Sequence, residues 1–400
     1  MIVIAGGDLV LPDRILTNAS LLIDGTRIAA VDPNAAIDPA GATVVRADDC
    51  YVVPGFIDVH VHGVEGYDTL DEGMPVADIA SRLPRYGVTA FAPTTVACPP
   101  RELRAVLEQV SRARVTRPAG SARVLPAHLE SNFINPEYRG AQPADCLRLP
   151  PGGDAPDAGR AFTARQILEV IESSRPDVGI VTLAPELPGA IEMVRSLAAA
   201  GHRVSIGHSG ANVDEAIAAI EAGARHATHL FNRMTPMTHR SPGIAGAVLS
   251  REDIAAELIC DGYHVHPAIC RVAIATKGTG RIMAITDGTG GSGLPAGSNA
   301  RLGGRRIRVT DNGAVLDDGT LAGSTLTMDR AFRTIVSTFG CSIVDAAVMC
   351  STTPARELGL TGFGVLSEGS AADVVILDRA FRVVRTFVDG AEIYRSGAVA

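Results

Sequence analysis

From residue 54 onward, apolar runs with the character of β-strands alternate with stretches of helical periodicity. One example is a strand expected at 179–183, between helices expected at 163–174 and 190–200. About eight such units fit into roughly 300 residues, and this alternation is typical of parallel βα units. The pattern therefore predicts an α/β fold, a (β/α)8 barrel of the TIM type. A doubly wound open sheet is the alternative, but no glycine-rich phosphate turn follows an early strand.

The two ends of the chain have a different texture, with short β-type runs separated by turn signals. We therefore expect a small β-sandwich domain built from 1–53 and 357–400, beside a metal-dependent catalytic barrel of 54–356. A glycine-rich insertion at 288–324 interrupts the last βα unit. An insertion of that length at a strand end is expected to form a loop or small hairpin over the mouth of the site.

The chain has 400 residues and a formal net charge of -8 at pH 7, without a basic stripe. Nucleic acid and membrane surfaces are therefore not expected as partners. The N-terminus has no positive segment before its short apolar run, and no apolar run approaches the roughly 18 residues of a membrane span. Seven scattered cysteines without a Cys-x-x-Cys pair fit reduced thiols. We therefore expect a cytoplasmic protein that binds no metal through cysteine.

One predicted strand ends in two histidines, His60 and His62, with Val61 between them. Side chains alternate along a strand, so the two imidazoles project to the same face, where they could bind a metal ion. Such a pair also occurs as two half-buried histidines in a sheet. Polar residues end other predicted strands as well, and the whole set is His60, His62, Glu130, His208, His229, His264 and Asp287.

The seven strand-end groups should converge, because all strands of such a barrel deliver their C-terminal ends to one face. Four or five imidazoles with carboxylates suit zinc or iron(II), whereas magnesium and calcium sites are richer in oxygen. We therefore expect a divalent cation, Zn²⁺ first and Fe²⁺ second, with one or two ions per chain. A non-catalytic barrel used for binding or assembly is the alternative, but such a barrel has no need for all seven groups.

Several short motifs, taken in order, make the chain resemble the amidohydrolase superfamily over nearly its whole length. They are Pro-Gly-Phe-Ile-Asp-Val-His-Val-His-Gly at 54–63, His-Leu-Glu-Ser-Asn-Phe-Ile-Asn-Pro at 128–136, Gly-His-Ser-Gly-Ala at 207–211, Thr-His-Leu-Phe-Asn-Arg-Met at 228–234, Asp-Gly-Tyr-His at 261–264, Thr-Asp-Gly at 286–288 and Leu-Ala-Gly-Ser at 321–324. In some branches of the superfamily a carboxylated lysine bridges two metals. The only lysine here is Lys277, which comes after these histidines and leaves Glu130 as the shared ligand.

The resemblance implies roles for the strand-end groups. The core metal would be held by Glu130, His208 and His229, and a second metal by His60 and His62. Asp287 would be the general base and acid. The implied reaction is hydrolysis of the acetamide of N-acetyl-D-glucosamine 6-phosphate to glucosamine 6-phosphate and acetate. The alternative is deacetylation of another N-acyl substrate, such as N-acetylgalactosamine 6-phosphate or an N-acyl amino acid.

The resemblance also implies a site for a phosphorylated amino sugar. Contacts to the sugar and the lining of the site would come from His264, Asn232 and the backbone of Leu321, Ala322 and Gly323. Arg240 matches the position of the arginine that binds the 6-phosphate in the family. A guanidinium suits this role because it can form bidentate hydrogen bonds to a phosphate. In some relatives this arginine comes from the neighbouring subunit, so we expect a homodimer. A plain surface arginine is the alternative for Arg240.

Three departures from the superfamily pattern concern the substrate more than the metal. Ser131 and Asn132 replace the usual Gly-Pro, which would add two polar side chains beside the metal. Ala141 and Gln142 stand where Ala-His is usual, so a neutral amide would donate to the developing oxyanion in place of a histidine. Arg233 replaces a small residue and would place an extra cation at the ligand.

Overall fold

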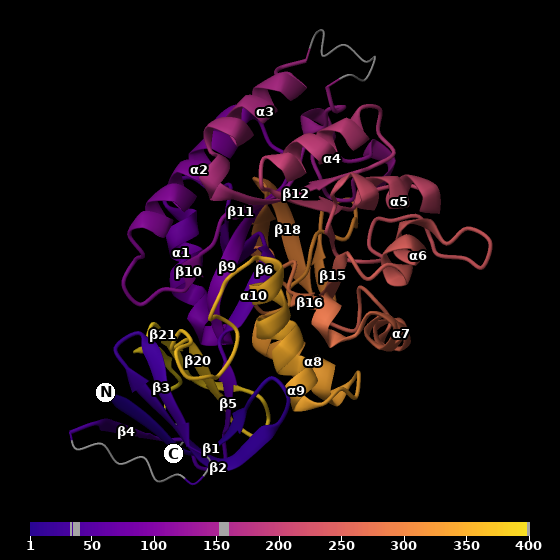
Figure 1. Cartoon of the computed structure of the whole chain (residues 1–400). Coiled ribbons are helices and arrows are strands. Elements are labelled where there is room, and N and C mark those ends of the chain that lie inside the picture. The colour runs from indigo at the N-terminus through magenta and orange to yellow at the C-terminus, as the bar shows by residue number, and fades with distance from the viewer. Residues whose placement is uncertain (33, 35–40, 152–159, 398–400) are drawn as a thin grey trace.

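The strands in the central part of the chain are parallel and follow one another around a nearly closed barrel (Figure 1). The structure, a computed structural model, describes residues 1–32, 34, 41–151 and 160–397. The main barrel strands are β6 (Phe56–Val61), β9 (Val88–Thr95), β11 (Ala127–Glu130), β12 (Val178–Leu183), β13 (Arg203–Ile206), β14 (His226–Ala227), β15 (Ala255–Ile259) and β16 (Ile282–Ile285), and the short β10 (Arg123–Val124) pairs with β9. The end of β6 meets the end of β16, because the Asp287 amide donates to the His60 carbonyl at 2.9 Å. The predicted (β/α)8 barrel is confirmed.

Helices cover the outside of the barrel (Figure 1). They are α1 (Pro75–Arg82), α2 (Pro100–Val115), α3 (Ala164–Ser173), α4 (Ala190–Ala199), α5 (Val213–Ala222), α6 (Gly243–Ser250), α7 (Pro267–Lys277) and α8 (Met328–Ser337), followed by α9 (Ile343–Ala347) and α10 (Thr353–Glu357). α3 begins with a capping box, in which Thr163 accepts from the Gln166 amide and the Gln166 side chain accepts from the Thr163 amide. Apolar side chains from strands and helices form one continuous core. This core fixes the strand ends that carry the site.

The two ends of the chain form a separate, mostly antiparallel sheet, which confirms the small β domain. Its strands are β1 (Ile2–Val10), β2 (Ile15–Asp24), β3 (Arg27–Asp32), β4 (Thr43–Arg46), β5 (Tyr51–Pro54), β20 (Val374–Leu377), β21 (Val383–Val388) and β22 (Ala391–Arg395). β5 pairs with β1 and with β20, so the first and last segments of the chain share one sheet. Side chains such as Ile4, Leu21 and Phe387 give it a core of its own. We propose that the domains divide at the expected boundaries, 1–53 with 357–400 against 54–356.

The glycine-rich insertion forms a small three-stranded antiparallel unit. Its strands are β17 (Asn299–Leu302), β18 (Arg305–Thr310) and β19 (Gly313–Val315). A separate two-stranded ribbon, β7 (Gly63–Val64) with β8 (Tyr67–Asp68), follows β6. Leu302 and Ile307 pack with Val96 of the segment after β9. Leu302 also lines the pocket described below, so the insertion lies at the mouth of the site as expected. Among the described helices, none combines the length and apolar character that a membrane span requires.

Candidate metal centre

Six of the seven strand-end groups meet in one buried cluster at the C-terminal end of the barrel. They are His60 at the end of β6, His62 just after it, Glu130 at the end of β11, His208 after β13, His229 after β14 and Asp287 after β16. His264 lies outside the cluster but lines the same pocket. Its Nδ1 donates to Oδ2 of Asp261 at 2.6 Å, which orients the ring. The predicted convergence of the strand ends is therefore present in the structure.

Glu130 joins two imidazoles on one side of the cluster. Its Oε1 lies 2.9 Å from Nε2 of His208 and 2.8 Å from Nε2 of His229, and the two nitrogens are 3.1 Å apart. Nδ1 of His208 donates to the Tyr138 carbonyl at 2.8 Å, which leaves the lone pair of Nε2 facing the carboxylate. This arrangement is unfavourable unless a proton or another cation lies between the groups. The donor set fits a zinc or iron(II) ion.

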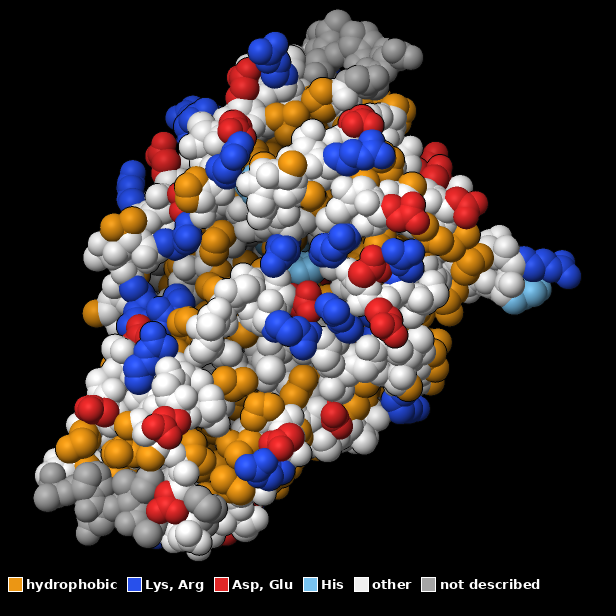
Figure 2. Space-filling view, viewed as in Figure 1, with side chains coloured by type: hydrophobic (Ala, Val, Ile, Leu, Met, Phe, Trp, Pro, Cys, Tyr) orange, Lys and Arg blue, Asp and Glu red, His pale blue; other side chains and the backbone are white. Residues whose placement is uncertain are grey.

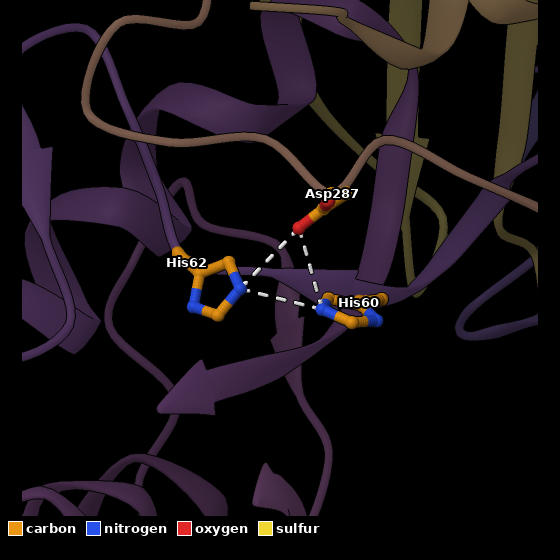
Figure 3. Close-up of side chains that lie close together, drawn as sticks. All are labelled: His60, His62 and Asp287. Atoms are coloured by element: carbon orange, nitrogen blue, oxygen red, sulfur yellow. Dashed lines mark hydrogen bonds and ion pairs between the residues drawn. The ribbon is translucent and has the colours of Figure 1, made fainter. Parts of the chain in front are cut away.

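His60, His62 and Asp287 form a second group of possible ligands (Figure 3). Nε2 of His60 and Nε2 of His62 are 3.3 Å apart, and Oδ1 of Asp287 lies 3.4 Å from the first and 3.3 Å from the second. Glu130 lies between the two groups, with Oε1 3.7 Å from Nε2 of His60 and Oε2 3.4 Å from Nε2 of His62. A carboxylate shared by two donor groups is compatible with one ion or with two.

Burial and neighbouring charges shift the pKa values in the cluster in different directions. Burial would raise the pKa of Glu130, but His208, with His229 and His62, outweighs burial and holds this pKa well below its ordinary value. Burial is likewise outweighed at Asp287, where His60 and His62 hold the pKa below its ordinary value. Burial lowers the pKa of His60 to about 4. At His62 burial is outweighed by Asp287 and Glu130, which raise the pKa to about 10. Both carboxylates are therefore ionised, as a cation site and a general base require.

Three groups of the cluster lie on left-handed backbone directly after their strands. The φ angle is 48° at His208, 29° at His229 and 49° at Asp287. Non-glycine residues adopt this conformation at a cost of about 1–3 kcal/mol each, and they do so mostly at functional sites. The sharp turn after each strand directs the side chain into the barrel mouth. The strain is evidence that the surrounding structure fixes these three side chains in place.

A pocket opens above the cluster. It is lined by His62, Glu130, Gly140, Ala141, Gln142, His208, His229, Asn232, Arg233, His264, Asp287, Leu302, Leu321 and Gly323. Most of the substrate residues expected from the sequence are thus brought together. Ala322 is not among the lining residues, because its side chain is buried in the core of the insertion. Arg240 is exposed on the segment before α6 and does not line the pocket of its own chain.

The first of the three sequence departures, Ser131 with Asn132, has a structural role that corrects our expectation. The Ser131 hydroxyl donates to the Thr182 carbonyl, and the Asn132 amide donates to the carbonyls of Cys98 and Cys146 at 2.9 and 2.8 Å. Both side chains therefore satisfy backbone groups instead of facing the ligand, because the segment after β11 turns away from the pocket. Gln142, of the second departure, does lie at the cluster. Its amide nitrogen donates to Oε2 of Glu130 and its oxygen accepts from the Ala97 amide at 2.7 Å.

Glu257 and His128 support the cluster from behind and were missed in the sequence. Oε2 of Glu257, which is fully buried, accepts from Nδ1 of His60 at 2.8 Å. The ring of His128 packs against that of His60, while its own nitrogens bond the Val59 carbonyl and the Thr182 hydroxyl. The available signal was a single acid in the middle of the otherwise apolar strand β15. A charge in such a strand is rarely tolerated without a partner.

Comparisons with known proteins agree with this geometry. The Amidohydrolase family model matches residues 51–393. The chain is 35% identical to the N-acetylgalactosamine-6-phosphate deacetylase of Escherichia coli O157:H7, over 94% of this chain and 97% of that protein. It is 33% identical to the N-acetylglucosamine-6-phosphate deacetylase of Bacillus subtilis (strain 168), over 96% of this chain and 94% of that protein.

Two solved structures have the same fold over almost the whole chain. The N-acetylglucosamine-6-phosphate deacetylase of Thermotoga maritima superimposes with a TM-score of 0.84 and 30% identity, covering 98% of this chain and 100% of that one. A mutant of the Mycobacterium smegmatis N-acetyl-D-glucosamine-6-phosphate deacetylase, in complex with N-acetyl-D-glucosamine-6-phosphate, gives a TM-score of 0.86 and 31% identity. That match covers 98% of this chain and 99% of the other.

Proposed function

Because this chain belongs to the amidohydrolase family, we propose that it hydrolyses the acetamide of N-acetyl-D-glucosamine 6-phosphate to glucosamine 6-phosphate and acetate. The chain is a hydrolase acting on an amide bond, as its deacetylase relatives are. One observation carries the proposal: a cluster of four imidazoles and two carboxylates lies beneath a pocket whose walls present amide and guanidinium groups. Enzymes of this family depend on a metal, and the donor groups present here suit one.

We propose that Glu130, His208 and His229 hold one divalent cation and that His60 and His62 contribute to a second. Zn²⁺ is the ion we favour, with Fe²⁺ as the other candidate, because imidazole and carboxylate ligands suit both. A cation bound there supplies an acidified water and polarises the substrate carbonyl. Gln142 keeps the Glu130 carboxylate in place through its hydrogen bond.

Asp287 is the group that moves the proton. Its carboxylate is ionised and lies at the pocket wall beside His60 and His62. It takes a proton from the attacking water as the new C–O bond forms, and it returns that proton to the nitrogen as the C–N bond breaks. Gly323 packs on Asp287, since a Cβ at Gly323 would lie 2.9 Å from the Asp287 carbonyl oxygen. This contact fixes the backbone that presents the carboxylate.

The pocket walls would orient the sugar. Nδ1 of His264 is bonded to Asp261, so its other ring nitrogen is left for a sugar hydroxyl. Asn232 donates from its amide to the His229 carbonyl at 3.1 Å, which keeps its oxygen at the pocket. We propose that these two residues, with Leu321 and Gly323, position the acetamide over the metal ligands.

We also propose that the protein acts as a homodimer in the cytoplasm. Arg240 lies outside the pocket of its own chain, so it would reach a substrate only in the pocket of a second copy. Large apolar side chains are exposed near it or on α7, namely Met237 at 46%, Ile269 at 41% and Val272 at 49%. Burial of such side chains between two copies is favourable. The mass of the protein in solution, measured by light scattering, tests this assembly.

Acetate release tests the proposed reaction. The zinc-loaded protein would be assayed with N-acetylglucosamine 6-phosphate, the same sugar without phosphate, and N-acetylgalactosamine 6-phosphate. We expect the highest kcat/KM for the first compound. The galactosamine epimer is included because a relative acts on it, and a higher kcat/KM for the epimer would assign this chain the other sugar. Absence of acetate release from all three compounds would refute the proposal.

A further inference from the structure

One residue of the pocket wall carries a fixed positive charge, and it is Arg233. Among the 14 lining residues, the others are imidazoles, two carboxylates, amides and small or apolar groups. No acidic side chain of the described residues forms an ion pair or hydrogen bond with the Arg233 guanidinium. A free guanidinium at the wall of a pocket is a site for an anion, because it offers several donors in a planar fork.

The backbone and a glycine fix the position of this side chain. Arg233 has a left-handed φ of 49°, and its carbonyl accepts from the Ser209 amide at 3.0 Å. A Cβ at Gly140 would lie 2.7 Å from Nε of Arg233, so the arginine lies directly on the Gly140 backbone. Gly140 and Arg233 both line the pocket. The guanidinium is therefore held at the wall formed by the Gly140–Gln142 segment.

The insertion next to this wall brings further arginines toward it, although Asp311, Asp317 and Asp318 offset most of their charge over the insertion as a whole. Four arginines of the insertion are exposed, and they are Arg301, Arg305, Arg306 and Arg308. Nη1 of Arg305 donates to the Ala141 carbonyl at 2.8 Å, which places this charge beside the pocket. Figure 2 shows basic side chains around a hollow in which histidine and acidic side chains are exposed. In a chain with a net charge of -8, such a local positive region attracts anionic substrates.

We infer that Arg233 binds the phosphate of the substrate from within the same chain, in addition to any contact from a second copy. This inference rests on the proposed function and specifies how its site selects a phosphorylated sugar. The sugar would lie with its acetamide over the metal ligands and its dianion against the Arg233 guanidinium. Arg233 is thereby a specificity-determining residue, and a chain with a small residue here lacks this contact.

The test compares variants on two substrates. Arg233→Ala, Arg233→Lys, Arg240→Ala and the control Arg139→Ala would be assayed with N-acetylglucosamine 6-phosphate and with the unphosphorylated sugar. Arg139 is a matched control, because it is exposed beside Gly140 and its Nη1 donates to the Pro136 carbonyl outside the pocket. We expect Arg233→Ala to lower the ratio of kcat/KM for the phosphorylated sugar to kcat/KM for the unphosphorylated sugar by on the order of 10- to 100-fold. Arg233→Lys should recover part of this ratio. The control should change the ratio by less than about 3-fold.

A binding measurement separates failure of this inference from failure of the proposed function. Calorimetry would compare glucosamine 6-phosphate with glucosamine on the metal-loaded wild type, Arg233→Ala and Arg139→Ala. If the wild type deacetylates the phosphorylated sugar and Arg233→Ala keeps its preference, the inference is wrong while the function stands. If the wild type releases no acetate, the function fails. Selective loss of glucosamine 6-phosphate binding in Arg233→Ala would then still support the phosphate site, and equal binding would overturn it.

Discussion

Replacement of Glu257 should weaken one of the two cation positions and spare the other. Oε2 of Glu257 accepts from Nδ1 of His60, which leaves Nε2 of that ring turned toward His62 and Asp287. A carboxylate behind a ligating histidine fixes its tautomer and its orientation and increases its basicity. Without this partner the His60 ring can rotate or protonate at the wrong nitrogen. The group formed by Glu130, His208 and His229 depends on Glu257 less, since Nδ1 of His208 bonds the Tyr138 carbonyl and Glu257 meets His229 only at its backbone amide, at 3.3 Å.

Loss of such a supporting carboxylate typically lowers metal affinity by about 10- to 100-fold, which corresponds to about 1.4–2.7 kcal/mol. We expect Glu257→Leu to lose this much affinity at the position that includes His60 and His62. Glu257→Gln should lose less, because its amide oxygen can still accept from Nδ1 of His60. Metal content would be measured by mass spectrometry after dialysis against a graded series of chelator concentrations, and thermal unfolding would show whether each variant is folded.

The result that would refute this reasoning is a folded Glu257→Leu variant that holds both ions as tightly as the wild type. Equal weakening of both sites would also contradict it, because it would assign Glu257 to the whole cluster. If Glu257→Leu does not fold but Glu257→Gln does, the metal affinities of the two sites are compared in Glu257→Gln. In Glu257→Gln we expect a smaller loss of metal affinity, confined to one site. An equal loss of affinity at both sites would contradict the reasoning.

Three further outcomes follow from the structure. Asp287→Asn should lower kcat by at least about 100-fold while the core metal stays bound, because the amide cannot accept the proton; near-normal turnover in this variant would remove Asp287 from the mechanism. Gly323→Ala should lower kcat by about 10- to 100-fold with an intact fold, since its Cβ would push against the Asp287 backbone; an unchanged rate would mean that this contact does not position the carboxylate. Burial lowers the pKa of His226 from 6.5 to about 3. The unfolded chain therefore binds a proton below about pH 6.5 that the folded chain does not bind, and stability falls as pH decreases. Metal-free wild type should lose about 3 kcal/mol more than His226→Leu between about pH 7 and about pH 4.5 in denaturant unfolding, and parallel pH profiles would contradict the assignment.

The regular parts of the fold could be predicted because their sequence patterns are strong. The helices expected at 163–174 and 190–200 are present as α3 and α4, and the Thr163 cap with Gln166 accounts for the sharp start of α3. α6 was missed because its sequence, Gly-Ile-Ala-Gly-Ala-Val-Leu-Ser, has two glycines and no polar face. α1 was not expected either, since its eight residues follow an irregular segment and begin with Pro75.

The cluster of candidate metal ligands could be predicted because barrel topology brings the strand ends together independently of the loop conformations. The partners of those groups could not be predicted in the same way. Glu257 lies inside β15, and the alternation of side chains does not say which buried groups of neighbouring strands it meets. Ser131 and Asn132 lie next to a ligand in sequence, but the turn after β11 directs them to backbone carbonyls. The place of Arg240 depends on the shape of the segment before α6, which has no periodic pattern.

The most direct test of the central claim is to titrate the chelated protein with Zn²⁺ while acetate release from N-acetylglucosamine 6-phosphate is followed. We propose that Glu130, His208, His229, His60 and His62 hold one or two ions. We therefore expect no turnover without metal and full turnover once one or two equivalents are bound, with none recovered in Glu130→Gln. Acetate release that persists without metal, or that never appears at any zinc concentration, would contradict metal-dependent deacetylation by this chain.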